Sequence, residues 1–227
     1  MAKGTAEIGI LPVFELNRMP GLVVLPGTGI GCHGSVRSIL LVSAKPAAEI
    51  RTLAADVSSR TSVQLVRVIL QRKFGASPQF LPHHPDLDAM LRSADAALII
   101  GDPALRIDPA RLPYHVYDLG AEWVEMTGLP MVFAVWAARK EAVSEEVVAA
   151  FVESCRYGRE RIEEIVSVES ARREFAPELV REYLTRNIVH EFGPRDYEGM
   201  DLYLRYTAPL LDRPTWVGYS GRSGGGQ

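Results

Sequence analysis

Short apolar segments, separated by longer amphipathic ones, dominate the first part of the chain. The segments "AEIGIL", "GLVVLPG", "SVRSILLVS", "RTLAAD", "PQFLP" and "DAALIIGD" are typical of strands, and a glycine-rich turn region, "GTGIGCHG", is predicted between the second and the third. Apolar residues recur at helical spacing from Thr61 to Phe74, which predicts a helix that Gly75 ends. Further helices are predicted at Asp86–Ser93 and "AEWVEMTG". Strands alternating with helices predict an α/β fold with largely parallel sheets.

The pattern changes to a helical one from Ser144 onward. The segment "SEEVVAAFVESCRYGRERIEEIVSV" predicts one long amphipathic helix, which Ser144 caps and which has acidic residues in its first turn. Two more helices are predicted around Pro177–Leu184 and Glu198–Leu211. The low-complexity tail, residues 220–227, is predicted to be disordered.

Composition narrows the class of protein. The 227 residues are 47% hydrophobic and 23% charged, as in a soluble globular protein with a sizeable core. A net charge of −3 without a basic stripe argues against nucleic acid as a partner. No segment approaches the ~20 apolar residues of a membrane span. The N-terminal segment, broken by charged residues and Pro12, does not resemble a signal peptide. We therefore expect a cytoplasmic protein that binds a small molecule, and a homodimer is compatible with the sequence.

Four hydroxyl side chains stand at the start of the predicted helix, namely Ser58, Ser59, Thr61 and Ser62. A helix N-terminus presents unpaired N–H groups and a partial positive charge, so it binds carboxylates or phosphates, and hydroxyl groups add donors there. In open α/β sheets, ligands bind at the carboxyl ends of strands, where this turn falls. The alternative is a plain helix cap with exposed serines. Arg60 is expected to be a solvated charge or a surface ion pair.

Other candidate residues lie in two turns. Gly101 and Asp102 follow a buried strand, so Asp102 either faces the same cleft or caps the turn before Pro103. Gly34 would allow close approach of the backbone to a ligand, although "GIGCHGS" lacks the Lys of a phosphate-binding Walker loop. No zinc pattern, Ser-His-Asp order or dinucleotide fingerprint is present, and we expect no metal.

Several segments together resemble one family. "DVSSRTSVQLVRVIL", "DAALIIGDPAL", "YDLGAEWVEMTGLPMVFAVWA" and "GSVRSILLVS" are similar to the chorismate dehydratases of the futalosine route to menaquinone, and the similarity extends from about Thr5 to about Leu211. The resemblance implies a type II periplasmic-binding-protein fold, with a ligand cleft between two α/β lobes. It also implies loss of water from chorismate to give 3-[(1-carboxyvinyl)oxy]benzoate, without a metal or an organic cofactor.

The resemblance also implies a set of substrate-binding positions, with Thr61 and Ser62 the closest matches. These positions are Ser58, Ser59, Thr61, Ser62, Gly34, Ser35, Gly101 and Asp102. The sister enzyme later in the pathway has a His beside the last of them, and "IIGDPAL" here favours the dehydratase. No His or Glu matches an obvious base, so the catalytic residue stays unassigned and a substrate carboxylate could take the proton.

The resemblance further implies a division into lobes. Residues 1–35 and 136–227 would form the first lobe and residues 36–135 the second, with the chain crossing near Ser35–Ser43 and Gly128–Ala137. The lobes would close on the ligand.

Family members usually begin with a further strand and helix, including an Asn that lines the active site. Here the first predicted strand, Glu7–Leu11, begins almost at Met1, and Asn17 lies in a different segment. We therefore expect this chain to lack part of the first lobe and to have little dehydratase activity alone.

A non-catalytic small-carboxylate binding protein of the same fold is the alternative function. Detection of water loss from chorismate, as opposed to binding without turnover, separates the two.

Overall fold

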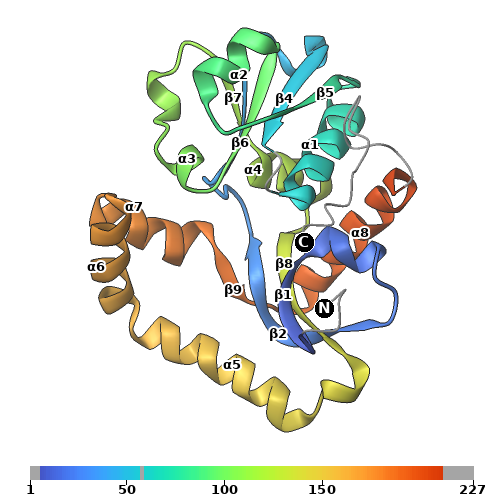
Figure 1. Ribbon diagram of the computed structural model, residues 1–227, viewed down its shortest axis with the longest axis vertical. Coiled ribbons are helices and arrows are strands. Elements are labelled where there is room, and N and C mark those ends of the chain that lie inside the picture. The colour runs from blue at the N-terminus through green and yellow to red at the C-terminus, as the bar shows by residue number, and fades with distance from the viewer. Residues whose placement is uncertain (1–5, 57–58, 212–227) are drawn as a thin grey trace, which may run out of the picture.

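The computed structural model describes residues 6–56 and 59–211, which fold into two β-sheets joined by helices (Figure 1). The strand order in the first sheet is β1-β8-β2-β9. Its strands are β1 (Ile8–Pro12), β2 (Leu22–Cys32), β8 (Met131–Arg139) and β9 (Val189–Glu191). The order in the second sheet is β5-β4-β6-β3-β7. Its strands are β3 (Ile39–Ser43), β4 (Thr52–Asp56), β5 (Gln79–His83), β6 (Ala96–Ile100) and β7 (His115–Asp118).

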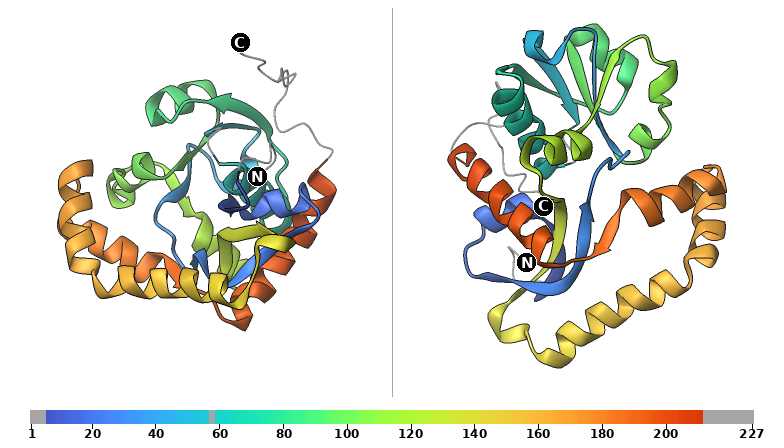
Figure 2. Two further views of the ribbon diagram at one scale, coloured as in Figure 1. Left: turned by 60° about the horizontal axis from the view of Figure 1, so that its bottom comes forward. Right: turned by 180° about the vertical axis from the view of Figure 1, so that it is seen from behind.

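The helices fall into two groups. Those that follow strands of the second sheet are α1 (Arg60–Lys73), α2 (Leu87–Ser93), α3 (Asp102–Leu105) and α4 (Leu119–Thr127). Those that follow β8 are α5 (Glu145–Glu160), α6 (Ile162–Arg173), α7 (Pro177–Glu182) and α8 (Pro194–Thr207). Helices α5 to α7 and the π-helical turn Tyr183–Asn187 form an arm, residues 145–187, that runs out from the first sheet and returns to it at β9 (Figure 2).

The strand directions differ from the sequence-based expectation. All pairings in the first sheet are antiparallel, and in the second sheet only β4 pairs in parallel, with β5 and β6. Strand β3 pairs antiparallel with β6 and β7. Parallel pairing needs a crossover connection, and helices α1 and α2 supply one only among β4, β5 and β6. The prediction of largely parallel sheets is therefore wrong.

Helix α1 confirms the predicted helix to within one residue at each end. Its apolar positions, among them Val63, Val66 and Ile69, are buried against the second sheet. Ser59 caps the helix by accepting the N–H of Ser62. Gly75 follows with φ of +69°, a left-handed conformation that glycine adopts at little cost. The helix therefore begins where the hydroxyl cluster was predicted to lie.

One hydrophobic core connects the two sheets. Trp123 of α4 is fully buried and packs edge-on against Tyr203 of α8, with 6.0 Å between ring centroids. Its indole N–H donates to the Pro130 carbonyl at 3.0 Å, so the ring is fixed in place. The chain passes from the first sheet to the second between Cys32 and Ile39 and returns after β7 through α4. These connections and the shared core hold the sheets close together.

The predicted glycine-rich turn is wrong, because most of it belongs to β2. A Cβ at Gly29 would lie 2.4 Å from the ring of Phe192, and one at Gly31 would lie 2.9 Å from the Met131 carbonyl oxygen. The glycines make room for a ring and a neighbouring strand, and glycine inside a strand often marks such close approach.

The predicted single long helix is also wrong, because it breaks at Arg161. This residue has φ of −111° and ψ of 25°, which ends α5 and lets α6 start in a new direction. Gly158 stands just before the break and lowers the helix propensity there. No residue of α5 is fully buried, so packing does not hold the segment straight. The change of direction brings α6 against α7.

Candidate functional site

A cavity of about 310 Å³ lies where the two sheets meet. Strands β1, β2 and β8 supply part of its wall. The segment between β2 and β3, the start of α1, the end of β6 and the π-helical turn also contribute. Its lining residues are Ile10, Leu11, Pro12, Ile30, Val36, Ser38, Ile39, Ser59, Ser62, Ile100, Gly101, Phe133, Ala134, Tyr183 and Ile188. The volume is at the lower end of the range of small-molecule sites, about 300–1,000 Å³.

The described lining residues carry polar side-chain atoms only as hydroxyl groups, arranged in two pairs. The first pair joins Ser59 and Ser62, whose Oγ atoms lie 2.9 Å apart. The second joins Tyr183 and Ser38, with the phenol donating to the serine Oγ at 3.0 Å. No charged side chain is among these lining residues, and the rest of the wall is apolar. The cavity therefore offers neutral donors among apolar side chains.

The Ser59–Ser62 pair adds to the polarity of a helix start. The Ser59 Oγ accepts the Ser62 N–H at 3.3 Å, and the remaining first-turn amides add a partial positive charge. Helix α1 has no acidic residue in its own first turn. Such a helix end binds carboxylates and phosphates.

The structure separates the other hydroxyl residues of this turn from the cavity. Thr61 is buried, and its Oγ1 accepts the Phe14 N–H at 3.4 Å while its carbonyl accepts the Tyr203 hydroxyl at 3.0 Å. Thr61 thus anchors neighbouring elements and does not line the cavity. Arg60 forms an exposed ion pair with Glu15 at 3.0 Å. A surface ion pair was one of the two roles predicted for Arg60. Ser58 lies outside the described residues.

Gly34 and Ser35 contribute to the cap of α4, outside the cavity lining. The Ser35 hydroxyl donates to Asp118 at 2.6 Å, and Asp118 in turn accepts two N–H groups of the first turn of α4. The Gly34 carbonyl lies close to Gly120, where a Cβ would approach it to 2.6 Å. These residues fix the connection between the sheets.

Gly101 lines the cavity, whereas Asp102 does not. Gly101 has φ of +71°, and its N–H donates to the Ser38 carbonyl at 2.7 Å. The Asp102 carboxylate forms an ion pair with Arg173 of the arm at 2.6 Å. The structure therefore brings together three of the predicted site residues, Ser59, Ser62 and Gly101.

Sequence reasoning missed Ser38 and Tyr183. Tyr183 reaches the cavity because α7 ends in a π-helical turn, which hydrophobic periodicity does not reveal. Burial raises the pKa of the Tyr183 phenol, with the nearby Asp102 adding to the increase, so this group stays protonated and donates. Burial also raises the pKa of the Cys32 thiol, to about 12, which makes it a poor nucleophile.

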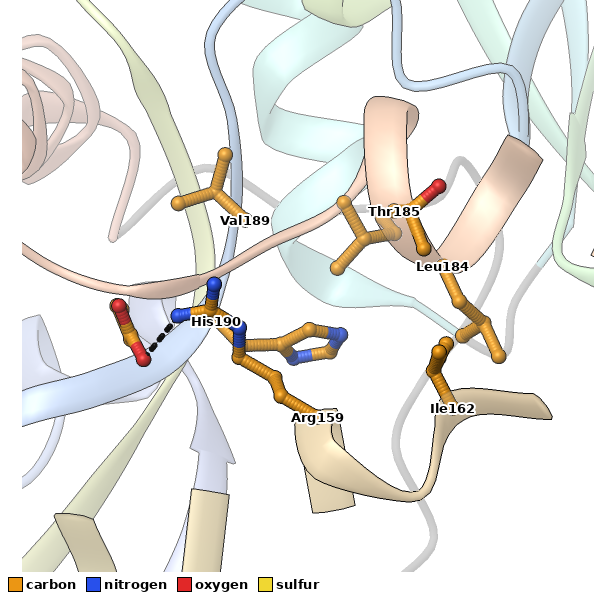
Figure 3. A pocket seen from close by; sticks show the side chains of 8 residues that line it. Arg159, Ile162, Leu184, Thr185, Val189 and His190 are labelled. Atoms are coloured by element: carbon orange, nitrogen blue, oxygen red, sulfur yellow. Dashed lines mark ion pairs between the residues drawn. The ribbon is translucent and has the colours of Figure 1, made fainter. Parts of the chain in front are cut away.

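A second cavity, of about 400 Å³, lies beside the first and shares Ile188 with it. Figure 3 shows the His190 ring projecting toward Leu184 and Ile162, while Arg159 pairs with the adjacent acidic residue at the edge. Burial lowers the pKa of His190, so its ring is neutral near pH 7. Ile162, the first residue of α6, lines this cavity, but its one arginine, Arg159, is already paired with Glu191 and no pair of hydroxyl groups stands at that helix start, so the first cavity is the better anion site.

Two absences hold for the described residues. Across residues 6–56 and 59–211, no three His, Cys, Asp or Glu side chains are grouped so that they could hold a metal ion. In the same part of the chain, no helix has the length and hydropathy needed to cross a membrane.

Fold and cavity define a protein of the type II periplasmic-binding-protein fold, as predicted. A structure of an Archaeoglobus fulgidus protein is 15% identical with a TM-score of 0.66, and covers 92% of this chain and 81% of its own. The periplasmic aliphatic sulphonate binding protein SsuA of Escherichia coli is 14% identical with a TM-score of 0.61. The match covers 92% of this chain and 72% of SsuA. These likenesses concern the fold.

Within this class, the chain belongs to the menaquinone biosynthesis family, which matches residues 1–209. It is 31% identical over 199 residues to a protein named chorismate dehydratase from Thermus thermophilus, with 79% of this chain and 73% of that relative covered. The resemblance seen in the sequence is therefore confirmed at the level of family.

Proposed function

We propose that this chain is a cytoplasmic hydro-lyase that removes water from chorismate to give 3-[(1-carboxyvinyl)oxy]benzoate. The observation that carries the proposal is the 31% identity to the Thermus thermophilus chorismate dehydratase. The cavity supports it, because two pairs of hydroxyl donors and a helix N-terminus suit a small molecule with two carboxylates. Apolar walls around the donors would strengthen these hydrogen bonds once the substrate has displaced water.

The two sheets support a division into lobes with the cavity between them. We place residues 36–56 and 59–130 in the second lobe, and residues 6–35 and 131–211 in the first. The sequence placed the boundary between the lobes after residue 135. We place it before Met131, because β8 pairs only with strands of the first sheet. Closure of the lobes on the substrate would complete the exclusion of water.

The reaction removes a proton from one ring carbon and hydroxide from its neighbour, and the new double bond makes the ring aromatic. The described lining residues include no His, Asp, Glu or Lys that could accept the proton. We therefore assign the base to a carboxylate of the substrate, as the sequence left open. The role of the protein is then to hold both carboxylates in a productive geometry.

The test is incubation of the purified protein with chorismate, with the product measured by mass spectrometry as loss of one water. Turnover above a reaction without protein supports the proposal. Heat-denatured protein is the control. Saturable binding of chorismate by calorimetry without any product would instead support the non-catalytic binding protein.

A further inference from the structure

Tyr183 enters the cavity from the arm, although most of the arm lies away from the sheets (Figure 2). Helix α7 widens into a π-helical turn at Tyr183–Asn187, in which the Ile188 N–H donates to the Tyr183 carbonyl at 3.0 Å. Such turns are rare and frequently occur at functional sites. Leu184, the next residue, lines the neighbouring cavity instead (Figure 3). The turn therefore separates two cavities and points the tyrosine into the candidate site.

The partner of Tyr183 is held firmly in place. Ser38 is buried, its N–H donates to the Val36 carbonyl at 2.7 Å, and its carbonyl accepts the Gly101 N–H at 2.7 Å. The preceding residue, Arg37, adopts a φ of 65° and donates from its guanidinium to the Ala104 carbonyl at 3.1 Å. These bonds fix the Ser38 backbone, so its side chain starts from a fixed position beside the tyrosine.

The hydrogen-bond directions leave one proton for a ligand. The Ser38 Oγ accepts the phenol proton, and among the described residues its own proton has no acceptor. The Ser59–Ser62 pair is similar, since one hydroxyl bonds the other and the remaining proton has no acceptor within residues 6–56 and 59–211. Each pair therefore presents one donor that is polarised by its partner. The two pairs come from different elements, so they suit two separate acceptor groups on one molecule.

We propose that the Ser38–Tyr183 pair is a second carboxylate-binding site, in which Ser38 donates to the substrate and Tyr183 is the positioning residue that orients the Ser38 proton. The Ser59–Ser62 pair binds the other carboxylate. This proposal rests on the proposed function, because that function supplies a substrate with two carboxylates. The raised pKa of Tyr183 is consistent with it, since a phenol that stays protonated keeps the direction of this hydrogen bond.

The experiment is calorimetric titration of three probes into the wild type, four test variants and one control variant. The first probe is 3-[(1-carboxyvinyl)oxy]benzoate, which has both carboxylates. The others are 3-methoxybenzoate, which keeps only the ring carboxylate, and 2-phenoxyacrylate, which keeps only the side-chain one. The variants are Tyr183→Phe, Ser38→Ala, their double variant and Ser62→Ala. Tyr157→Phe is the matched control, because it removes an exposed phenol hydroxyl from the same arm.

We expect Tyr183→Phe and Ser38→Ala to weaken binding of the two-carboxylate probe about tenfold or more, as for a lost hydrogen bond to a charged group. Each of these two substitutions should weaken binding of one single-carboxylate probe and leave binding of the other within about twofold of the wild type. Ser62→Ala should weaken binding of the other single-carboxylate probe instead. The double variant should bind no more weakly than Ser38→Ala, because Tyr183 acts through Ser38. Tyr157→Phe should bind like the wild type.

Three results would overturn the proposal. Unchanged binding of all probes by Tyr183→Phe would show that Tyr183 does not orient Ser38. Equal weakening of binding for all three probes would indicate lost packing. Additive losses of affinity in the double variant would mean that Tyr183 contacts the ligand itself. The chorismate assay on the wild type distinguishes failure of the second carboxylate site from failure of the proposed function. Turnover with an unaffected Tyr183→Phe variant would defeat only the second carboxylate site. A folded wild type that binds none of the probes would defeat both proposals.

Discussion

At the scale of single residues, neighbouring hydroxyl groups have different roles. Thr61 and Ser62 were the closest matches to ligand-binding positions, yet only Ser62 lines the cavity. The Thr61 Oγ1 accepts the buried N–H of Phe14, which lies in the first turn of the 3₁₀ helix Val13–Asn17. Consecutive residues on a helix point about 100° apart, so the two hydroxyls face different surroundings.

Substitution of these two residues should separate stability from binding. Thr61→Val keeps the shape of the side chain but leaves the Phe14 N–H without an acceptor, which should cost about 1–3 kcal/mol of the free energy of unfolding and leave ligand affinity nearly unchanged. Ser62→Ala should weaken ligand binding with little loss of stability. Urea unfolding and calorimetric titration measure the two quantities. Weaker ligand binding by a fully folded Thr61→Val variant would indicate that Thr61 takes part in ligand binding.

At the scale of elements, Asp95 joins β4 to the start of β6. Its carboxylate accepts the N–H of Arg51 at 2.9 Å and that of Thr52 at 3.1 Å, and it forms an ion pair with Lys45 at 2.7 Å. The hydrogen bond to Lys45, with those from the two backbone amides, lowers the pKa of Asp95 from 3.8 to about 2. These bonds fix the register where two parallel strands begin.

This lowered pKa predicts a particular response to acid. A carboxyl group with a lower pKa in the folded state stabilises the fold above its unfolded pKa, and this contribution is lost as the pH falls from 3.8 to about 2. We expect about 1–2 kcal/mol, after allowance for partial exposure. Asp95→Asn should be less stable than the wild type at pH 7, and the difference should shrink toward pH 2. Urea unfolding across this range measures it, and a constant difference would contradict the assignment.

Element positions were largely predictable because local patterns determine them. Helix α1 and strands β3 to β6 follow from spacing, caps and apolar runs that lie within the segments themselves. The errors arise where distant residues decide. Phe192 occupies the space above Gly29, and packing against α7 favours the break at Arg161. For the same reason the Ser59–Ser62 pair could be anticipated as a helix start, whereas its companions Ser38 and Tyr183 are 145 positions apart.

At the scale of the whole molecule, the arm connects the first sheet to the second. Arg173, at the end of α6, pairs with Asp102 at 2.6 Å, and the guanidinium of Arg106 lies 4.5 Å from the ring centroid of Phe175. Asn187 donates to the Ser35 carbonyl at 3.2 Å. The arm therefore touches the second sheet's helices and the segment through which the chain first crosses between the sheets. Any opening of the two lobes must break or carry along these contacts.

Loss of the contacts at the end of α6 should allow the two lobes to move further apart. We expect the double variant Arg106→Ala, Arg173→Ala to have a larger radius of gyration than the wild type without ligand, and to compact more when ligand binds. Its affinity should fall only a few fold, because exposed ion pairs contribute about 0–1 kcal/mol each. Small-angle X-ray scattering with and without ligand makes the comparison, and Arg156→Ala, at an exposed pair within α5, is the control. Superimposable profiles of the wild type and the double variant would argue against a restraint by the arm.

The absence of charge from the described cavity lining has a consequence for how the protein responds to its surroundings. Hydroxyl groups and backbone amides do not ionise near neutrality, so between about pH 6 and about pH 9 the carboxylates of the substrate would be the ionised groups in the cavity, and they too keep their charge there. The rate of dehydration as kcat/KM should therefore be nearly flat over this interval, without the bell shape that a paired acid and base produce. A steady-state pH series tests this, and a clear inflection would reveal an ionising protein group. With a flat profile, the rate of this step would follow substrate supply and remain insensitive to drifts in the surrounding pH.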